Sequence, residues 1–125
     1  MFAIRKFVPE DGKQVKDLIL TVMETEFPEQ KQTYPLHDLD DIPQAYGNIG
    51  DAFFVAHFGD EIIGTVAVKK EDERTALLRR IFVKSTFRNR RYGVRLIEEA
   101  IRYCALIGYQ EVVFKTTSNM DRAIN

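Results

Sequence analysis

The sequence predicts a single α/β domain in which a mixed central β-sheet is flanked by helices, and three observations support this fold class. Strand-like and helix-like segments alternate along the 125 residues, without repeats or a linker. The dipeptide Gly59-Asp60 separates two apolar segments, and glycine suits the turn of an antiparallel hairpin. A later strand follows a helical crossover, which favours parallel pairing with the strand before the helix.

The first half of the chain is predicted to contain a short strand, a helix and a long loop. Alternating apolar residues favour a strand from Phe2 to Val8, and Pro9 to Asp11 mark the start of a helix. The apolar residues of this helix recur at helical spacing: Val15, Leu18, Ile19 and Val22. Prolines and turn residues interrupt the pattern from Phe27 to Asp51, so we expect a loop with one short helix near Leu39 to Tyr46.

The second half is predicted to supply most of the sheet. We expect antiparallel strands in "AFFVAHF" and "EIIGTVAV", and a third strand from Thr75 to Val83. A helix ended by Gly108 follows, with one apolar face made of Ile97, Ala100, Ile101, Cys104 and Ile107. The segment from Glu111 to Thr117 is then predicted to pair in parallel with the strand from Thr75 to Val83.

Composition and charge exclude several classes of protein and indicate one kind of ligand. The chain is 45% hydrophobic, which is too apolar for disorder, and no apolar run approaches the roughly 20 residues of a membrane span. A single cysteine, Cys104, is expected in the core, and we predict a reducing, cytoplasmic location. From Arg74 to Ile97 there are eight basic residues and no acidic ones, so one face should attract anions.

The stretch "FRNRRYGVRL", Phe87 to Leu96, is the candidate anion site. It lies between the end of a predicted strand and the first turn of a helix, where free N–H groups and the helix dipole favour negative charge. Arginine donors match phosphate oxygens in pairs, and Gly93 allows close approach of a ligand to the backbone. The alternative is that these arginines bind no ligand and only form the solvent-exposed, basic start of a helix.

The order of elements, together with "LLRRIFV", "FRNRRYGVRL" and "GYQEVVFKTT", resembles the GCN5-related N-acetyltransferase (GNAT) family. This resemblance implies a three-layer α/β/α acetyltransferase domain spanning residues 1–125, acetyl-CoA as co-substrate and no metal. The RxxGxG signature of the family matches Arg88 and Gly93, but Arg91 stands in place of the first glycine. Arg91 could hinder the approach of the backbone or add its own phosphate contact, and we favour the phosphate contact.

The resemblance also implies which residues bind the cofactor. The backbone of Ile81, Phe82 and Val83 would bind the pantetheine arm, and Asn119 would lie near the thioester. The pyrophosphate would be held by a loop whose members are Arg88, Asn89, Arg90, Arg91, Tyr92, Gly93 and Val94.

The catalytic residues stay unassigned. Many relatives have a glutamate where this chain has Leu77, and the tyrosine acid of the family, with its last two strands, would lie beyond Asn125. Either the chain is shortened, or another chain completes it. An open edge at the strand from Glu111 to Thr117 would favour pairing with a second copy, so we predict a homo-oligomer.

The leading functional hypothesis is an N-acetyltransferase that acts on an amine of a small molecule or a protein. A non-catalytic acyl-CoA-binding or regulatory module of the same fold is the alternative. Nucleic acid is ranked last as a partner, because the chain is nearly neutral and the helix after the arginines carries acids. We predict no association with membranes.

Other polar residues receive mostly structural roles. Arg79 and Arg80 are adjacent on a strand, so we expect them on opposite faces and in ordinary surface pairs with acids. The loop acids Asp38, Asp40 and Asp41 either attract a cationic amine or cap the short helix, and we favour capping. The remaining candidates, expected to be surface or packing residues, are His37, His57, Tyr34 and Tyr46.

Overall fold

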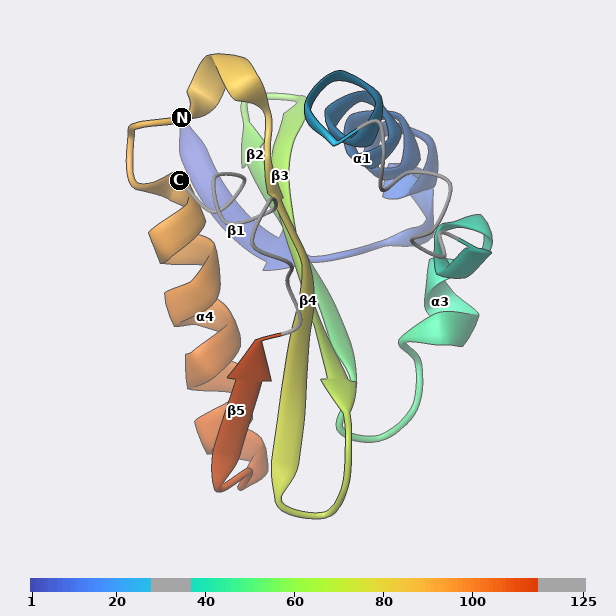
Figure 1. Ribbon diagram of the computed structural model, residues 1–125, viewed down its shortest axis with the longest axis vertical. Helices are drawn as coiled ribbons and strands as arrows, with labels where there is room; N and C mark the ends of the chain where they lie inside the picture. The colour runs from blue at the N-terminus through green and yellow to red at the C-terminus, as the bar shows by residue number, and fades with distance from the viewer. Residues whose placement is uncertain (28–36, 115–125) are drawn as a thin grey trace.

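A computed structural model of the chain describes residues 1–27 and 37–114. Within them, five strands form one mixed sheet in the order β1-β2-β3-β4-β5 (Figure 1). The strands are β1 (Phe2–Lys6), β2 (Ala52–Phe58), β3 (Glu61–Lys70), β4 (Thr75–Val83) and β5 (Glu111–Phe114). Neighbours from β1 to β4 are antiparallel, and β5 is parallel to β4. The predicted mixed sheet and its pairings are confirmed.

Helices cover both faces of this sheet. Helix α1 (Gly12–Glu26) and the short α3 (Ile42–Ala45) lie on one side, and α4 (Tyr92–Ile107) lies on the other (Figure 1). In the part of the chain that the structure describes, three single turns of 3-10 helix lie in the connections: η1 (Pro9–Asp11), η2 (His37–Asp40) and η3 (Ser85–Phe87). The three-layer α/β/α architecture is therefore confirmed, including a short helix in the long loop.

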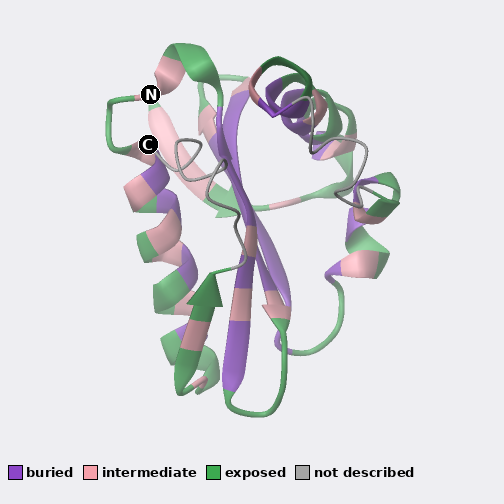
Figure 2. Ribbon diagram, in the orientation of Figure 1, coloured by how far each residue is buried: buried purple, intermediate pink, exposed green. Residues whose placement is uncertain are grey.

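Two hydrophobic cores are separated by the sheet. Alternate residues of β2 contribute to each, because successive side chains of a strand point to opposite faces: Phe53 and Val55 pack with α1, while Phe54 and Ala56 pack with α4. Figure 2 shows the resulting buried stripes along β2, β3 and β4 and along the inner sides of α1 and α4. The central strands are thus buried on both faces, as their nearly continuous apolar sequences require.

The end of β1 and the buried face of α4 differ from the prediction. Strand β1 ends at Lys6 and not at Val8, because the chain turns into η1 at Pro9. On α4 the buried residues are Gly93, Leu96, Ala100 and Cys104, whereas Ile101 and Ile107 are 43% and 48% exposed. The stripe that contacts the sheet is therefore narrower than the apolar face of the sequence. The helix ends as predicted, with Gly108 at φ +105°.

A β-bulge in β4 changes the direction of its side chains. Thr65 of β3 pairs with Phe82 and Ala67 pairs with Arg79, so two residues of β4 oppose the single residue between them. Arg80 provides the extra residue, with φ +55°, and its carbonyl accepts a 2.7 Å hydrogen bond from the Thr65 hydroxyl. Side-chain alternation is therefore shifted by one residue beyond this point.

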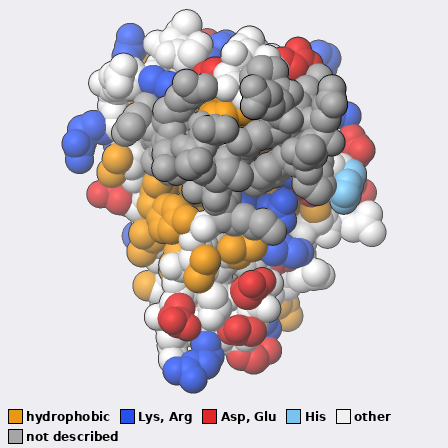
Figure 3. Space-filling view, viewed as in Figure 1, with side chains coloured by type: hydrophobic (Ala, Val, Ile, Leu, Met, Phe, Trp, Pro, Cys, Tyr) orange, Lys and Arg blue, Asp and Glu red, His pale blue; other side chains and the backbone are white. Residues whose placement is uncertain are grey.

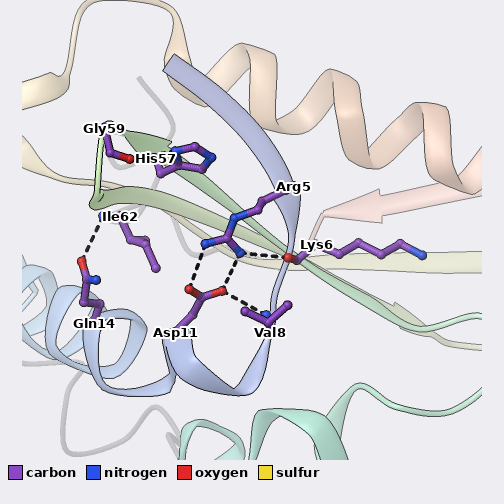
Figure 4. A network of polar contacts seen from close by, with 8 residues as sticks. All are labelled: Arg5, Lys6, Val8, Asp11, Gln14, His57, Gly59 and Ile62. Carbon is purple, nitrogen blue, oxygen red and sulfur yellow. Dashed lines mark hydrogen bonds and ion pairs between the residues drawn. The ribbon is translucent and has the colours of Figure 1, made fainter. Parts of the chain in front are cut away.

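An ion pair fixes the junction between β1 and α1 (Figure 4). Arg5 donates to both carboxylate oxygens of Asp11, at 2.7 and 3.0 Å, and the amide of Val8 donates to the same carboxylate at 2.9 Å. The hydrogen bond from Arg5 lowers the pKa of the buried Asp11 below its ordinary value. The chain direction between strand and helix is consequently set by a charged, well-satisfied group.

Candidate functional site

The connection from β4 to α4 contains two residues in the left-handed region of backbone conformation. Asn89 has φ +64°, and Arg91, which precedes the first residue of α4, has φ +65° and ψ 17°. Glycine is favoured in this region because it has no Cβ to clash with the backbone. Arg91 thus adopts, at some steric cost, the conformation that suits the glycine of the signature it departs from.

The start of α4 has neither a side-chain cap nor an acidic residue. Arg91 makes no capping hydrogen bond with its side chain, and the first turn of the helix contains no acidic residue. The N–H groups at the start of a helix lack acceptors within the helix and lie at the positive end of its dipole. Tyr92, Gly93 and Val94, which belong to this first turn, therefore present a site for negative charge.

Three arginines surround this helix start without compensating acids. Arg90 lies over the ring of Phe87 with 5.5 Å to its centroid, and Arg95 lies over Phe2 at 4.5 Å. Phe2 in turn stacks on Tyr92 at 4.1 Å. Among the described residues, Arg90, Arg91 and Arg95 form no ion pair, so the positive charge of the candidate site stays uncompensated.

Arg88, the first residue of the signature, has a different environment. Its Nε donates to the carbonyl of Val83 at 3.0 Å, and its Nη1 donates to Glu26 at the end of α1. The side chain is 13% exposed. Arg88 therefore connects the loop to the end of β4 and to α1, and its charge is compensated by Glu26.

The last residues of β4 differ in the direction of their backbone groups. The amide of Lys84 donates to Ile63 of β3 at 2.7 Å, and hydrogen-bonded pairs alternate in an antiparallel ladder. By this alternation Phe82 faces its partner Thr65 on β3, while Ile81 and Val83 direct their N–H and C=O groups away from β3. On that other side, the described pairing of β4 with β5 ends at Leu78.

The bulge brings a buried ionic cluster together on the α1 side of the sheet. Arg80 donates from Nε to Oδ2 of Asp38 at 3.0 Å and from Nη2 to Oδ1, and Tyr46 donates its hydroxyl to Oδ2 at 2.6 Å. The charges of Arg79 and Arg80 both act on Asp38 and Tyr46. The two arginines therefore share a face, and the expectation of opposite faces and surface pairing is wrong, because the bulge interrupts the alternation.

Electrostatics in this cluster keep Asp38 charged and Tyr46 neutral. Burial alone would raise the pKa of Asp38, but the hydrogen bonds from Arg80 and Tyr46 outweigh it and lower that pKa. Burial, reinforced by the bond to Asp38, raises the pKa of Tyr46 far above its ordinary value. Asp38 is therefore a weak base whose oxygens are bound to Arg80 and Tyr46, and Tyr46 stays a neutral phenol.

The other loop acids have structural partners. Asp41 caps α3 by accepting a 3.3 Å hydrogen bond from the amide of Gln44, which confirms capping for this residue. Asp40 pairs with Lys16 of α1 at 2.7 Å. Asp38 binds Arg80 and Tyr46 and caps no helix, so the capping role favoured for it is wrong, and attraction of a cationic amine stays untested.

The remaining candidates are the two histidines, Tyr34, Tyr46, Cys104 and Asn119. His37 is exposed in η2, and Nδ1 of His57 lies 3.0 Å from the carbonyl oxygen of Gly59. Tyr46 packs against Phe53 and Cys104 is buried, as predicted, and burial raises the pKa of the Cys104 thiol. Tyr34 and Asn119 lie outside the described residues.

Apolar side chains are exposed where α4 and β5 meet. Leu106 is 74% exposed, and Val113 and Phe114 of β5 are 48% and 42% exposed. Figure 3 shows apolar side chains gathered over this part of the molecule. The homo-oligomer expected at this edge stays a prediction.

In the described part of the chain, no helix is long and apolar enough to cross a membrane. Nor do three or more His, Cys, Asp or Glu side chains gather there in an arrangement that could hold a metal ion.

Sequence reasoning missed the pairing of Arg80 with Asp38. These residues are 42 positions apart, and the pairing depends on a bulge that the residue types of β4 do not predict. One signal was present, because two arginines inside the apolar segment "LLRRIFV" need a compensating acid if that strand is buried. The acids of the loop before β2 were the candidates.

Comparisons with known proteins agree with this fold. The N-acetylaspartate synthetase of Danio rerio is 35% identical over 83 residues, which are 65% of this chain and 29% of that protein. A GNAT-family acetyltransferase structure from Staphylococcus aureus Mu50 has a TM-score of 0.82 at 21% identity, covering 96% of this chain and 76% of that one. The structure of AAC(6')-Iy in complex with the bisubstrate analogue CoA-S-monomethyl-acetylneamine has a TM-score of 0.72 at 18% identity, covering 94% and 81%.

The two solved structures establish the fold, and a family-level match establishes the relationship. The profile described as "Acetyltransferase (GNAT) family" matches residues 17–125, which is most of the chain. The chain therefore belongs to the Acetyltransferase (GNAT) family.

Proposed function

We propose that this chain binds acetyl-CoA and transfers its acetyl group to an amine of a small molecule or a protein. The left-handed turn at Arg91, followed by an uncapped and acid-free helix start, is the observation that carries the proposal. It leaves consecutive amides beside uncompensated arginines, which is the environment that a pyrophosphate requires. Membership of the family supports the assignment of acetyl-CoA to this site.

The cofactor would contact two parts of the site. Ile81 and Val83 would bind the pantetheine arm through the backbone groups that face away from β3. Phe82 would lie between them, with its own backbone groups directed toward β3. The pyrophosphate would lie against Arg91, Tyr92, Gly93 and Val94, with Asn89 and Arg90 shaping the loop and Arg88 holding it to β4. Asn119 keeps its proposed place near the thioester.

The thioester supplies an activated acetyl group, and the chain would bind and orient it. The residues that move protons are left unassigned, because Leu77 has no acid–base group and Asp38 is occupied by Arg80 and Tyr46. We also propose a cytoplasmic location, since the buried Cys104 is the only cysteine.

Isothermal titration with CoA tests the proposed site. We expect binding in the micromolar range, and a variant that adds a carboxylate to the first turn, Val94→Glu, should weaken it at least about tenfold through repulsion of the phosphates. The same variant should keep or raise stability, because an acid at a helix start favours the dipole.

Ile101→Glu is the matched control, because it adds the same charge to the exposed middle of α4. It should leave CoA affinity unchanged within about twofold. No heat of binding up to millimolar CoA, or equal losses in the two variants, would refute the proposed site.

The alternative of a non-catalytic acyl-CoA-binding module is favoured by one observation. Leu77 occupies the place where a carboxylate is common in the family, and it is half-buried beside Lys69. An assay of free CoA release over a panel of amines separates the two functions. CoA binding with turnover supports the enzyme, and CoA binding without acceleration by any amine supports the module.

A further inference from the structure

Arg79 carries a positive charge that no ion pair with a described residue neutralises. Its side chain is half-buried, and its Nε is buried away from solvent without a hydrogen-bond partner. Among the described residues, no carboxylate forms an ion pair with this guanidinium. Buried donors are almost always satisfied in proteins, so an unsatisfied guanidinium donor indicates a missing acceptor.

Asp38, whose carboxylate interacts electrostatically with Arg79, accepts no hydrogen bond from Nε of Arg79. Oδ2 of Asp38 already accepts hydrogen bonds from Arg80 and Tyr46, and Oδ1 accepts from Arg80. Tyr46 is held in its neutral form and adds no negative charge. Within the described residues, Asp38 forms its ion pair with Arg80, and Arg79 forms none.

The position of Arg79 on β4 relates this charge to the proposed cofactor site. Arg79 comes two residues before Ile81, whose backbone faces the side where the pantetheine arm is proposed to bind. Arg79 pairs with Ala67, which belongs to the core on the α1 side, so its side chain lies on that side of the sheet, whereas α4 and the proposed pyrophosphate site lie on the other side. Figure 3 shows basic side chains grouped on this face of the molecule.

We propose that Arg79 binds an anionic oxygen group, a carboxylate or a phosphate, on the acceptor amine. This inference rests on the proposed acetyl transfer and names the substrate class of that same site. The planar guanidinium offers paired donors that match either group. In the overall exchange, the amine nitrogen bonds to the acetyl carbon, the carbon–sulfur bond breaks, and the proton lost by nitrogen balances the thiolate as free thiol.

Matched acceptors test the inference. CoA release from acetyl-CoA is measured with L-amino acids and their amides, and with glucosamine-6-phosphate and glucosamine. We expect at least one anionic member to exceed its neutral counterpart in kcat/KM by about 10- to 100-fold. The two pairs distinguish a carboxylate from a phosphate.

Variants of Arg79 locate the effect. Arg79→Gln should remove most of this preference while changing the neutral acceptor by less than about threefold, and Arg79→Lys should keep only part of it. Arg102→Gln, which removes a surface arginine paired with Glu99, is the control and should keep the preference. Thermal unfolding and CoA titration of each variant show that it is folded and binds the cofactor.

Each outcome bears on one level of the account. If the protein without substitutions does not bind CoA, the proposed function is overturned, and this inference with it. CoA binding without turnover of any acceptor overturns the inference, because no acceptor is then used. If anionic and neutral acceptors are turned over equally well, or if the preference is kept in Arg79→Gln, the inference is overturned and the proposed function is not.

Discussion

Arg80 and Asp38 form a buried ion pair that attaches the loop before β2 to the bulge of β4. The side chain of Arg80 is fully buried and that of Asp38 is 15% exposed, and Nε of Arg80 lies 3.0 Å from Oδ2 of Asp38. A buried guanidinium needs such an anion, because desolvation of an uncompensated charge is costly. The pair therefore makes the folded loop and the bulged strand depend on each other.

Asp38→Asn should consequently destabilise the protein by about 3 kcal/mol. The change keeps the shape of the side chain but removes the charge that compensates Arg80. Urea unfolding followed by circular dichroism measures the free energy of unfolding. Asp41→Asn, which weakens the cap of α3 alone, should cost about 1 kcal/mol or less. Equal effects of the two variants would show that the ion pair is unimportant.

Stability should fall as the pH drops through the acid range. The pKa values of Asp11 and Asp38 are lower in the folded state than their ordinary value of 3.8. Their contributions are thus fully present above that value and are lost as the pH falls through the folded-state pKa values. Unfolding curves from pH 6 to pH 2 measure this loss. Asp11→Asn should flatten the profile, and an unchanged profile in that variant would contradict the assignment.

Arg91→Gly should stabilise the protein, although it removes a side chain. The left-handed conformation of Arg91 costs about 1–2 kcal/mol for a residue with Cβ, and part of the relief is offset by the greater unfolded-state freedom of glycine. We expect a net gain of about 0.5–1 kcal/mol in urea unfolding. Arg90→Gly, at a neighbour without positive φ, should instead lose stability.

The same variant tests whether the Arg91 side chain contacts phosphate. Because glycine keeps the turn, a lower CoA affinity in Arg91→Gly reports the lost guanidinium and not a distorted loop. We expect a loss of about 5- to 20-fold in calorimetry at low salt. Affinity equal to that of the unchanged protein would assign Arg91 a purely conformational role.

Arg88→Met should act through the loop and not through direct loss of a phosphate contact. It removes the bonds from Arg88 to Val83 and Glu26, so it should lower stability by about 1–3 kcal/mol. A double-mutant cycle with Glu26→Gln should show coupling of the two changes. Additive effects in the cycle would mean that the Arg88–Glu26 pair is not formed in solution.

Most of the fold could be predicted from local sequence patterns. The hairpin at Gly59, the helix end at Gly108 and the parallel pairing of β5 each follow from residue types or from one crossover rule. The width of the buried stripe on α4 could not, because Ile101 and Ile107 are apolar but lie beyond the edge of the contact with the sheet. Burial depends on the neighbouring layer as well as on the residue itself.

Only the part of the candidate site that is formed by residues close in sequence could be predicted. The arginines and the helix start around Gly93 are close in sequence, so their position between a strand and a helix could be read directly. The shared face of Arg79 and Arg80 depends on a bulge and on a partner 42 residues away, and alternation alone gives the wrong answer. The direction of the Arg88 side chain likewise depends on Glu26, at the end of a helix distant in sequence.

Backbone amide shifts on addition of CoA test the central claim most directly. We predict the largest changes at Ile81 and Val83, whose amides face away from β3, and at Tyr92, Gly93 and Val94 in the first turn of α4. Phe82, whose amide faces β3, should change less and serves as the control within the strand. Shifts that are absent at millimolar CoA, or that cluster away from β4 and the start of α4, would contradict the account.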